Sequence, residues 1–222
     1  MFDRLVQPFQ PKDRFRIATT KRGLPSCEVR LLQDADLAAC EGIYRLNEPG
    51  RFPEGYFPRF SDWLRNRRAL ILVAESEGEI RGVGGINAEE RAGQHFAVLS
   101  FGMVHPAYQR AGFGTTLLLA RLALLNPRNG RSTVMLSTVG GSESFYARFG
   151  FRYLQTFPDP GGYTGDTYIT KLVSPDPKRC LSVLHHADVS LATLDASVPS
   201  FASLSSATMG PAVNDQQGQP SA

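Results

Sequence analysis

The sequence predicts one α/β (α+β) domain, because segments with strand-like alternation and segments with helical spacing follow one another from about residue 27 to residue 173. A hydrophobic content of 42% in 222 residues is enough for one sizeable core. Composition changes on both sides of this region. We expect a basic N-terminal extension over residues 1–26, the domain over 27–173, and a tail over 174–222 that holds a short helix at 181–194 and is otherwise disordered.

The first part of the domain reads as a strand, two helices and three strands. Residues 28–32 alternate as a strand does, and Asp34 is a typical N-cap for a helix that continues to about Leu46. Three prolines and two glycines between residues 47 and 58 separate this helix from an amphipathic helix over 60–67. The next strands are expected over residues 69–75, 79–88 and 96–104, with a tight turn at Glu77-Gly78.

The second part adds a helix, a strand, a short helix and two strands. Residues 112–125 are apolar on almost every side of a helix, which implies burial against the sheet, and Asn126-Pro127 stops this helix. The remaining elements are expected as a strand over 133–138, a helix over 142–149, and strands over 151–155 and 167–173. The predicted order is therefore βααβββαβαββ.

A glycine-rich turn, Gln109-Arg110-Ala111-Gly112-Phe113-Gly114-Thr115, joins the strand over 96–104 to the apolar helix. Backbone N–H groups at a helix start lack intrahelical acceptors and lie at the positive end of the helix dipole, so such a turn can bind a phosphate or pyrophosphate. The turn contains no lysine, which excludes a Walker loop. A dinucleotide fingerprint is excluded as well, because Leu117 stands where its third Gly or Ala is required.

The pattern that remains, Gln/Arg-x-x-Gly-x-Gly/Ala after Val-x-Pro, resembles the acyl-coenzyme A loop of the GNAT superfamily of N-acetyltransferases, with Gln109, Gly112 and Gly114 at the family's marked positions. Residues 144–151 resemble the family's late helix, which carries a Tyr-x-x-x-Gly-Phe motif. The order of elements over residues 27–173 also resembles the GNAT fold. Two motifs in the right order make the resemblance much more specific than the loop alone.

The resemblance implies the GNAT acyl-CoA N-acyltransferase fold, with a mixed central sheet of six to seven strands and helices on both faces. The strands over 96–104 and 133–138 are expected to splay apart and leave a cleft for pantetheine, whose amides pair with strand groups as an added strand would. Gly102 is well placed for the β-bulge that often ends such pairing.

A donor site for acetyl-CoA follows from the same resemblance. Many family members carry an asparagine seven residues before the tyrosine; Val139 stands there in this chain, so one polar cofactor contact is missing. The residues that the resemblance assigns to cofactor binding are Met103, Val104, Gln109, Arg110, Ala111, Gly112, Phe113, Gly114 and Thr115.

Acylation of an amine requires a base for the amine and an acid for the leaving thiolate. Tyr146 matches the family tyrosine near the thioester sulfur, and a tyrosine hydroxyl, with an ordinary pKa of about 10, can donate its proton at neutral pH. A backbone N–H of Met103 or Val104 could polarise the thioester carbonyl. The candidates for a general base are Glu90 and His95, with Glu89 and His105 as alternatives.

In the GNAT fold the acceptor amine enters between the first two helices and the later strands, which points to residues 47–60 and 161–166. Aromatic residues in or near these segments could form an apolar wall, or could simply attach irregular loops to the core. The wall candidates are Tyr56, Phe57, Trp63 and Tyr163, and the acids that could attract a cationic amine are Glu48, Glu54 and Asp166.

These features together predict transfer of an acetyl group from acetyl-CoA to a primary amine of a small molecule. Two alternatives stay open: a protein N-terminus or lysine as acceptor, and an acyl-CoA-binding module without turnover. The net charge of +3 is too small to indicate nucleic acid, no apolar run is long enough to span a membrane, and the three cysteines lack metal-ligand spacing. We expect no metal, no nucleic-acid or membrane partner and a cytoplasmic location, and leave a homodimer open.

Overall fold

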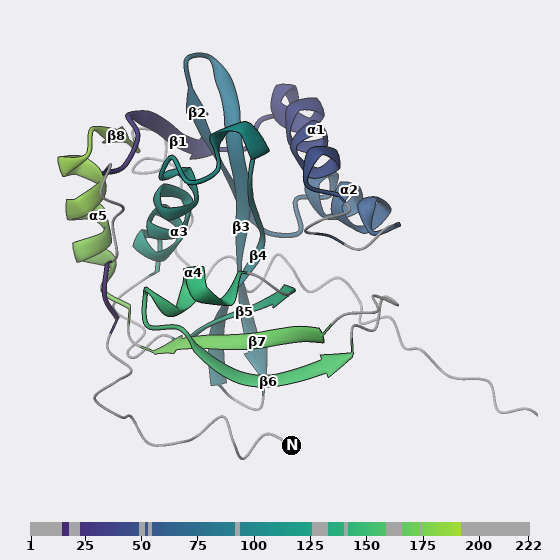
Figure 1. Ribbon diagram of the computed structural model, residues 1–222, viewed down its shortest axis with the longest axis vertical. Coiled ribbons are helices and arrows are strands. Elements are labelled where there is room, and N and C mark those ends of the chain that lie inside the picture. Colours follow the sequence, from purple (N-terminus) through teal and green to yellow (C-terminus); the bar gives the residue numbers. More distant parts are fainter. Residues whose placement is uncertain are drawn as a thin grey trace, which may run out of the picture.

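The computed structural model describes residues 15–17, 23–48, 52, 55–91, 94–125, 133–139, 142–158, 166–173 and 175–191. These residues form a sheet of eight strands in the order β6-β7-β5-β4-β3-β2-β1-β8. Helices α1 and α2 cover one face of the sheet, and α3, α4 and α5 lie on the other side (Figure 1). The predicted fold class is therefore confirmed, including the helices on both faces.

The strands are β1 (Cys27–Leu31), β2 (Leu70–Ser76), β3 (Glu79–Arg91), β4 (Gln94–Val104), β5 (Thr133–Val139), β6 (Arg152–Pro158), β7 (Asp166–Val173) and β8 (Val189–Ser190). The helices are α1 (Leu37–Asn47), α2 (Phe57–Arg65), α3 (Phe113–Ala123), α4 (Glu143–Ala147) and α5 (Pro177–His186), with 3₁₀ turns at Asp34–Asp36 and Pro106–Tyr108. The predicted order of elements is confirmed from β1 to β7.

The sheet has eight strands, one more than the upper limit of the six to seven expected, because the chain after α5 returns to the edge of the sheet beside β1. Val189 and Ser190 pair in parallel with Cys27 and Glu28 of β1. Two residues are too few to show as alternation in a sequence.

The helix expected over 181–194 lies earlier and is shorter. Pro177 occupies its first turn and Asp176 caps it, with the carboxylate accepting a hydrogen bond of 3.0 Å from the Arg179 N–H. Both are favourable helix-start residues. The apolar residues Val189 and Leu191 lie within the predicted range, but they pack into the core beyond the helix end.

The start of α1 also differs from the expectation that Asp34 caps it. One 3₁₀ turn, Asp34–Asp36, precedes the helix, and it is the Asp36 carboxylate that accepts a bond of 2.8 Å from the Gln33 N–H. Arg30 of β1 donates to the same carboxylate and to Glu75 of β2. Asp36 therefore ties the first helix to two strands, a contact that local sequence cannot show.

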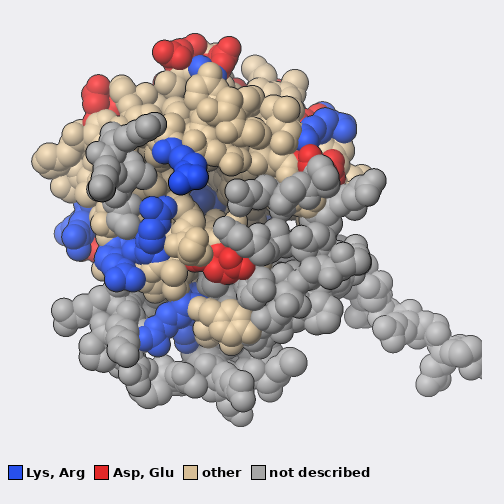
Figure 2. Space-filling model, in the orientation of Figure 1, with Lys and Arg blue, Asp and Glu red and all other residues tan. Residues whose placement is uncertain are grey.

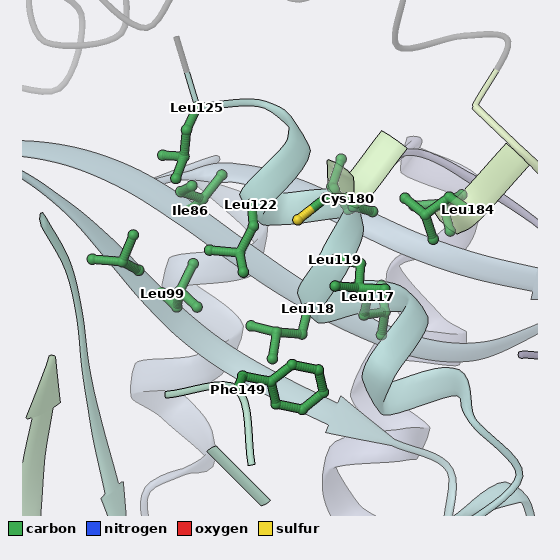
Figure 3. Close-up of a cluster of buried hydrophobic side chains, with 14 of the residues drawn as sticks. Ile86, Leu99, Leu117, Leu118, Leu119, Leu122, Leu125, Phe149, Cys180 and Leu184 are labelled. Atoms are coloured by element: carbon green, nitrogen blue, oxygen red, sulfur yellow. The ribbon is translucent and has the colours of Figure 1, made fainter. Parts of the chain in front are cut away.

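The core is divided between the two faces of the sheet. On one face, α3 lies between the strands and α5, and its leucines contact both (Figure 3). The described α3 side chains from Thr115 to Leu122 are all buried, as the apolar pattern predicted. On the other face, α1 and α2 pack an aromatic cluster against the sheet, with Tyr44, Phe60 and Trp63 at its centre.

The predicted separation of β4 from β5 is present and begins within β4. This strand pairs in parallel with β5 only from Phe96 to Leu99, although it continues to Val104. Beyond Leu99 a bulge places two residues, Phe101 and Gly102, opposite the single residue Gly84 of β3. The bulge expected at Gly102 is therefore present, and Phe101 carries the positive φ of 43°.

We predict that α5 contributes to stability through Leu184, which is fully buried against α3. Leu184→Ala should lower the free energy of unfolding by about 2–5 kcal/mol, because it removes buried methyl groups and leaves a cavity. Chemical denaturation measures the change. Leu46→Ala is the control, since this side chain is 57% exposed, and should change stability by about 0.5 kcal/mol or less. Equal denaturation midpoints for the two variants would show that α5 is not part of the cooperative fold.

Candidate active site

The glycine-rich turn presents free backbone donors at the start of α3. The first helical hydrogen bond runs from the Thr116 N–H to the Gly112 carbonyl at 3.0 Å. The N–H groups of Phe113, Gly114 and Thr115 therefore have no acceptor in the helix. Because the N-cap is Gly112, no cap side chain satisfies them. Three converging donors at the positive end of a helix suit a phosphate or pyrophosphate.

The two glycines of this turn have different roles. A Cβ at Gly114 would meet other atoms only at ordinary contact distances, 3.7 Å from Val104 Cγ2 and 3.8 Å from Phe145 Cζ. Gly112 has φ of +104°, and its Cβ would lie 2.8 Å from Pro25 Cδ. Gly112 is thus required by its own conformation and by the N-terminal segment. A larger residue at Gly112 would therefore disturb packing before it blocked the approach of an anion.

Gln109 holds the turn in place. Its side-chain amide donates to Asn47 Oδ1 at 3.0 Å and to the Val104 carbonyl at 3.3 Å. Asn47, a buried residue at the end of α1, donates to the same carbonyl at 3.2 Å and to Ile43 O at 2.8 Å. The turn, the end of β4 and the end of α1 therefore share one hydrogen-bond network.

Of the two predicted backbone donors, Val104 is the one that faces the open side of β4. The His105 N–H donates to Arg81 O at 2.9 Å, so the pair one residue before it, Val104 and Gly82, directs its backbone groups away from the partner strand. The Val104 N–H thus points to the side from which β5 has separated. Met103 precedes it in register and turns its backbone groups toward β3, while its side chain is buried against α1 and α2.

Tyr146 lies beside the start of α3. It is half-buried in α4, its ring 5.0 Å from that of Phe145 and 5.4 Å from that of Phe151. Phe145 is the residue that a Cβ at Gly114 would contact, so the two sequence motifs meet in space. The Tyr146 hydroxyl also interacts with the guanidinium of Arg121, two turns along α3. Arg121 was not among the site residues predicted from the sequence, although one arginine within an apolar run was a visible signal.

The other residues of the predicted loop are divided between surface and core. Arg110 is exposed and has φ of 66°, whereas Phe113 and Thr115 are buried and Ala111 packs against the core. The side chains of Ala111, Phe113 and Thr115 therefore support the turn, and the backbone N–H groups at the start of α3 remain available to a ligand.

The structure does not bring Glu90 and His95 to Tyr146. They pair with each other next to the β3–β4 turn. Arg121 lies beside Gly102 of β4 and also interacts with Tyr146, so Gly102 marks the part of β4 near the tyrosine. His95 precedes Gly102 by seven residues, which corresponds to about 23 Å at the usual rise of a strand. The side chains of Glu89, Glu90 and His95 lie outside the described residues. His105 has a structural bond, since its Nδ1 accepts from the Ala107 N–H at 3.2 Å.

The surface charge around the turn is positive. Arg110 in the turn and Arg148 at the end of α4 are exposed, and so is Arg16, which donates to Ala147 O at 3.2 Å. Basic side chains gather on the side of the molecule that carries α3 and α4, whereas acidic ones gather at the β2–β3 turn (Figure 2). The field on the α3 side would attract an anionic ligand.

Two further properties concern the described part of the chain. Its residues contain no group of three or more His, Cys, Asp or Glu side chains close enough to hold a metal ion. None of the helices in the described ranges has the length and apolar character to cross a membrane.

Comparisons with known proteins agree with this geometry. The model of the acetyltransferase (GNAT) family matches residues 37–151, just over half of the chain. No curated protein matches the sequence. A ribosomal-protein-alanine N-acetyltransferase from Brucella melitensis is similar in structure, with a TM-score of 0.52, 22% identity and coverage of 65% of this chain and 98% of that one. An aminoglycoside 6′-N-acetyltransferase complexed with coenzyme A has a TM-score of 0.54 and 14% identity, covering 67% and 97%.

The fold and the two motifs define an acyltransferase of the GNAT class. The chain belongs to the GNAT acetyltransferase family. Because the sequence identities to these solved structures are low, their likeness establishes the fold, and their substrates are not transferred to this chain.

The two glycines of the turn should respond in opposite ways to alanine. Gly112→Ala should lower the melting temperature, because a residue with φ of +104° is strained by about 1–2 kcal/mol and the new Cβ would crowd Pro25. Gly114→Ala should raise stability by up to about 1 kcal/mol, because alanine is the better helix former and has room there. Thermal denaturation of both variants makes the comparison. Equal shifts would contradict the separate roles given to the two positions.

Proposed function

We propose that this protein is an N-acetyltransferase that transfers the acetyl group of acetyl-CoA to a primary amine. One observation carries the proposal: the free donors of α3, the outward N–H of Val104 and the hydroxyl-bearing residue Tyr146 converge where β4 and β5 have separated. This is the set of groups that acyl transfer from a phosphate-bearing thioester requires.

The donor fits the described residues. The N–H groups of Phe113, Gly114 and Thr115 would bind the pyrophosphate, and Gly114 leaves them uncovered. The unpaired edge of β4 at Val104 would accept pantetheine as an added strand. Acetyl-CoA supplies an activated acetyl group when bound. Tyr146 would protonate the departing sulfur, and the Val104 N–H would stabilise negative charge on the carbonyl oxygen.

The acceptor site is proposed at the end of α1, where Asn47 donates to the Val104 carbonyl. There the Tyr44 hydroxyl and Glu48 Oε1 are buried and have no hydrogen-bond partner among the described residues. Burial, and then the nearby Glu48 carboxylate, raise the pKa of Tyr44 above its ordinary range, so its hydroxyl stays protonated. Buried polar atoms are normally paired. An ammonium or amine group would supply the missing donor for Glu48.

Aromatic rings surround these two polar groups. Phe52 stacks on Tyr44 at 4.7 Å, and Phe57 meets it edge-on at 5.6 Å. Of the wall residues expected from the sequence, Tyr56 and Phe57 belong to the group of rings around Tyr44. Trp63 is only 6% exposed and belongs to the core. Glu54 and Tyr163 lie outside the described residues, as does the side chain of Asp166.

Gly114→Glu should separate donor binding from folding. A carboxylate in the first turn of α3 stabilises the helix, so the melting temperature should not fall. The same charge should repel the pyrophosphate and weaken acetyl-CoA binding about tenfold or more, which corresponds to ~1.4 kcal/mol. Calorimetric titration with acetyl-CoA measures the affinity. Gly114→Ala is the matched control and should bind normally, because the loop pattern accepts Gly or Ala there. Unchanged affinity in Gly114→Glu would defeat the loop assignment.

The function itself is tested by two measurements on the whole protein: thermal stabilisation by acetyl-CoA, and release of free thiol across a panel of small amines, lysine peptides and peptides with free N-termini. We expect stabilisation and thiol release with at least one class of acceptor, and a loss of about 10²–10⁴-fold in rate for Tyr146→Phe, the usual contribution of a general acid. Stabilisation without thiol release would indicate an acyl-CoA-binding module. No stabilisation would remove the donor assignment.

Glu48→Gln should act on the acceptor alone. Loss of the buried negative charge should raise the KM for a cationic amine about tenfold or more, because a hydrogen bond to a charged group contributes about 1.5–3 kcal/mol. The affinity for acetyl-CoA should not change. Steady-state kinetics with the best acceptor of the panel measures the KM, and Glu41→Gln on the same helix is the control, since Glu41 already has a partner in Arg65 of α2. An unchanged KM would place the acceptor elsewhere.

A further inference from the structure

Arg121 is a buried charge without a carboxylate partner among the described residues. Arg121 is 2% exposed and lies in the last turn of the apolar helix α3. The two other well-buried arginines are paired: Arg30 with Asp36 and Glu75, and Arg81 with Glu77 and Glu79. Burial lowers the pKa of Arg121 below its ordinary value, and Tyr146 acts in the opposite direction. A buried cation of this kind is a cost to stability that apolar side chains of similar size avoid.

The sheet is shaped to receive this guanidinium. A Cβ at Gly84 of β3 would lie 3.0 Å from Arg121 Cζ, and one at Gly102 of β4 would lie 2.9 Å from its Nη2. The two glycines thus form a slot at the bulge of β4. Arg121 Nε donates to Leu117 O at 3.1 Å, and Nη1 donates to Gly85 O at 3.4 Å. These bonds set the direction of the guanidinium and leave further N–H donors for Tyr146.

We propose that Arg121 is a positioning residue that donates to the phenolic oxygen of Tyr146, directs the tyrosine proton toward the leaving sulfur and stabilises the tyrosinate formed when that proton departs. The proposal rests on the proposed function, since it needs Tyr146 as the acid. An arginine has donors only, so a hydroxyl that accepts from it keeps its own hydrogen for another acceptor. The cation also lies next to the one atom of the protein that would become negative during the reaction.

The proton balance is simple. The amine nitrogen forms a bond to the acetyl carbon, the carbon–sulfur bond breaks, and its electron pair goes to sulfur. Tyr146 gives its proton to that sulfur, so that the free thiol of CoA leaves, and Arg121 balances the charge of the tyrosinate. The amine loses one proton to solvent, and the tyrosinate takes one back from solvent. No oxidant or metal is needed.

The first test needs no acceptor amine. CoA is bound to the wild type, Arg121→Met and Tyr146→Phe, and its thiolate is followed by ultraviolet absorbance as a function of pH. Donation from Tyr146, supported by Arg121, should stabilise the thiolate, so the bound thiol in the wild type should have a lower pKa than in either variant. A role of Arg121 in folding alone would leave this titration unchanged, and an unchanged titration in Arg121→Met would overturn the proposal.

The second test is a double-mutant cycle on thiol release with the acceptor found above. Arg121→Met should lower kcat about 10- to 100-fold, the range of a hydrogen bond that involves a charge. It should have little further effect in the Tyr146→Phe background, because it acts through that residue. The same loss in both backgrounds would overturn the role of Arg121 and leave Tyr146 as the acid. No loss in Tyr146→Phe would overturn the proposed acid itself, a separate outcome.

Stability provides the third comparison. Arg121→Met should melt at the same or a higher temperature than the wild type, because a buried cation is replaced by an apolar chain of similar length. The control Arg30→Met should melt at a lower temperature, because it leaves Asp36 and Glu75 without their partner where β1, β2 and the start of α1 meet, and it should keep its kcat, because Tyr146 retains Arg121. If Arg121→Met does not fold, Arg121→Lys takes its place in all three measurements. A melting temperature that falls in parallel with kcat in both Arg121 variants would show a structural role only.

Discussion

The bulge at Phe101 and Gly102 is the constraint on which the rest of the site depends. Up to Leu99, β4 is an interior strand with a neighbour on either side. The extra residue then increases the twist of the strand, and β4 does not pair with β5 beyond Leu99. The Val104 N–H, which points to the β5 side, is therefore left open to a ligand. The open edge is therefore a result of one inserted residue, and the start of α3 and Tyr146 are arranged around it.

The same bulge joins the two halves of the core. Phe101 directs its ring to the aromatic cluster, 4.8 Å from Trp63 and 5.2 Å from Phe60. Gly102 faces α3 and leaves room for Arg121. Phe101, the residue with the strained φ, is thus held by rings on the proposed acceptor side. Its neighbour Gly102 borders the proposed donor side. Strain at a functional position persists only where the surroundings determine it, and here two packed clusters do so.

The features predicted correctly from the sequence are those that local chemistry determines. The free donors of the glycine turn and the burial of α3 follow from residue types within about ten positions of each other. The bulge at Gly102 was expected from the family resemblance, with a strand glycine as its local sign. The features that sequence reasoning missed depend on partners far along the chain. Gln109 bonds to Asn47, which is 62 positions away, and Arg121 meets glycines of two strands. Pattern and propensity carry no information about such pairs, so Gln109 could be recognised only as a motif residue and its bonds could not be foreseen.

The N-terminal extension illustrates the same limit and adds a physical consequence. Pro25 and the Gly23 carbonyl lie where a Cβ of Gly112 would stand, and the Arg16 N–H donates to Phe149 O at 3.3 Å just after α4. Phe15, Ile17 and Leu24 pack against the core on the same face. The extension therefore contacts both the turn before α3 and the end of the helix that carries Tyr146. These two elements carry the phosphate donors and the tyrosine, so residues that composition alone describes as a basic arm pack beside both parts of the proposed donor site.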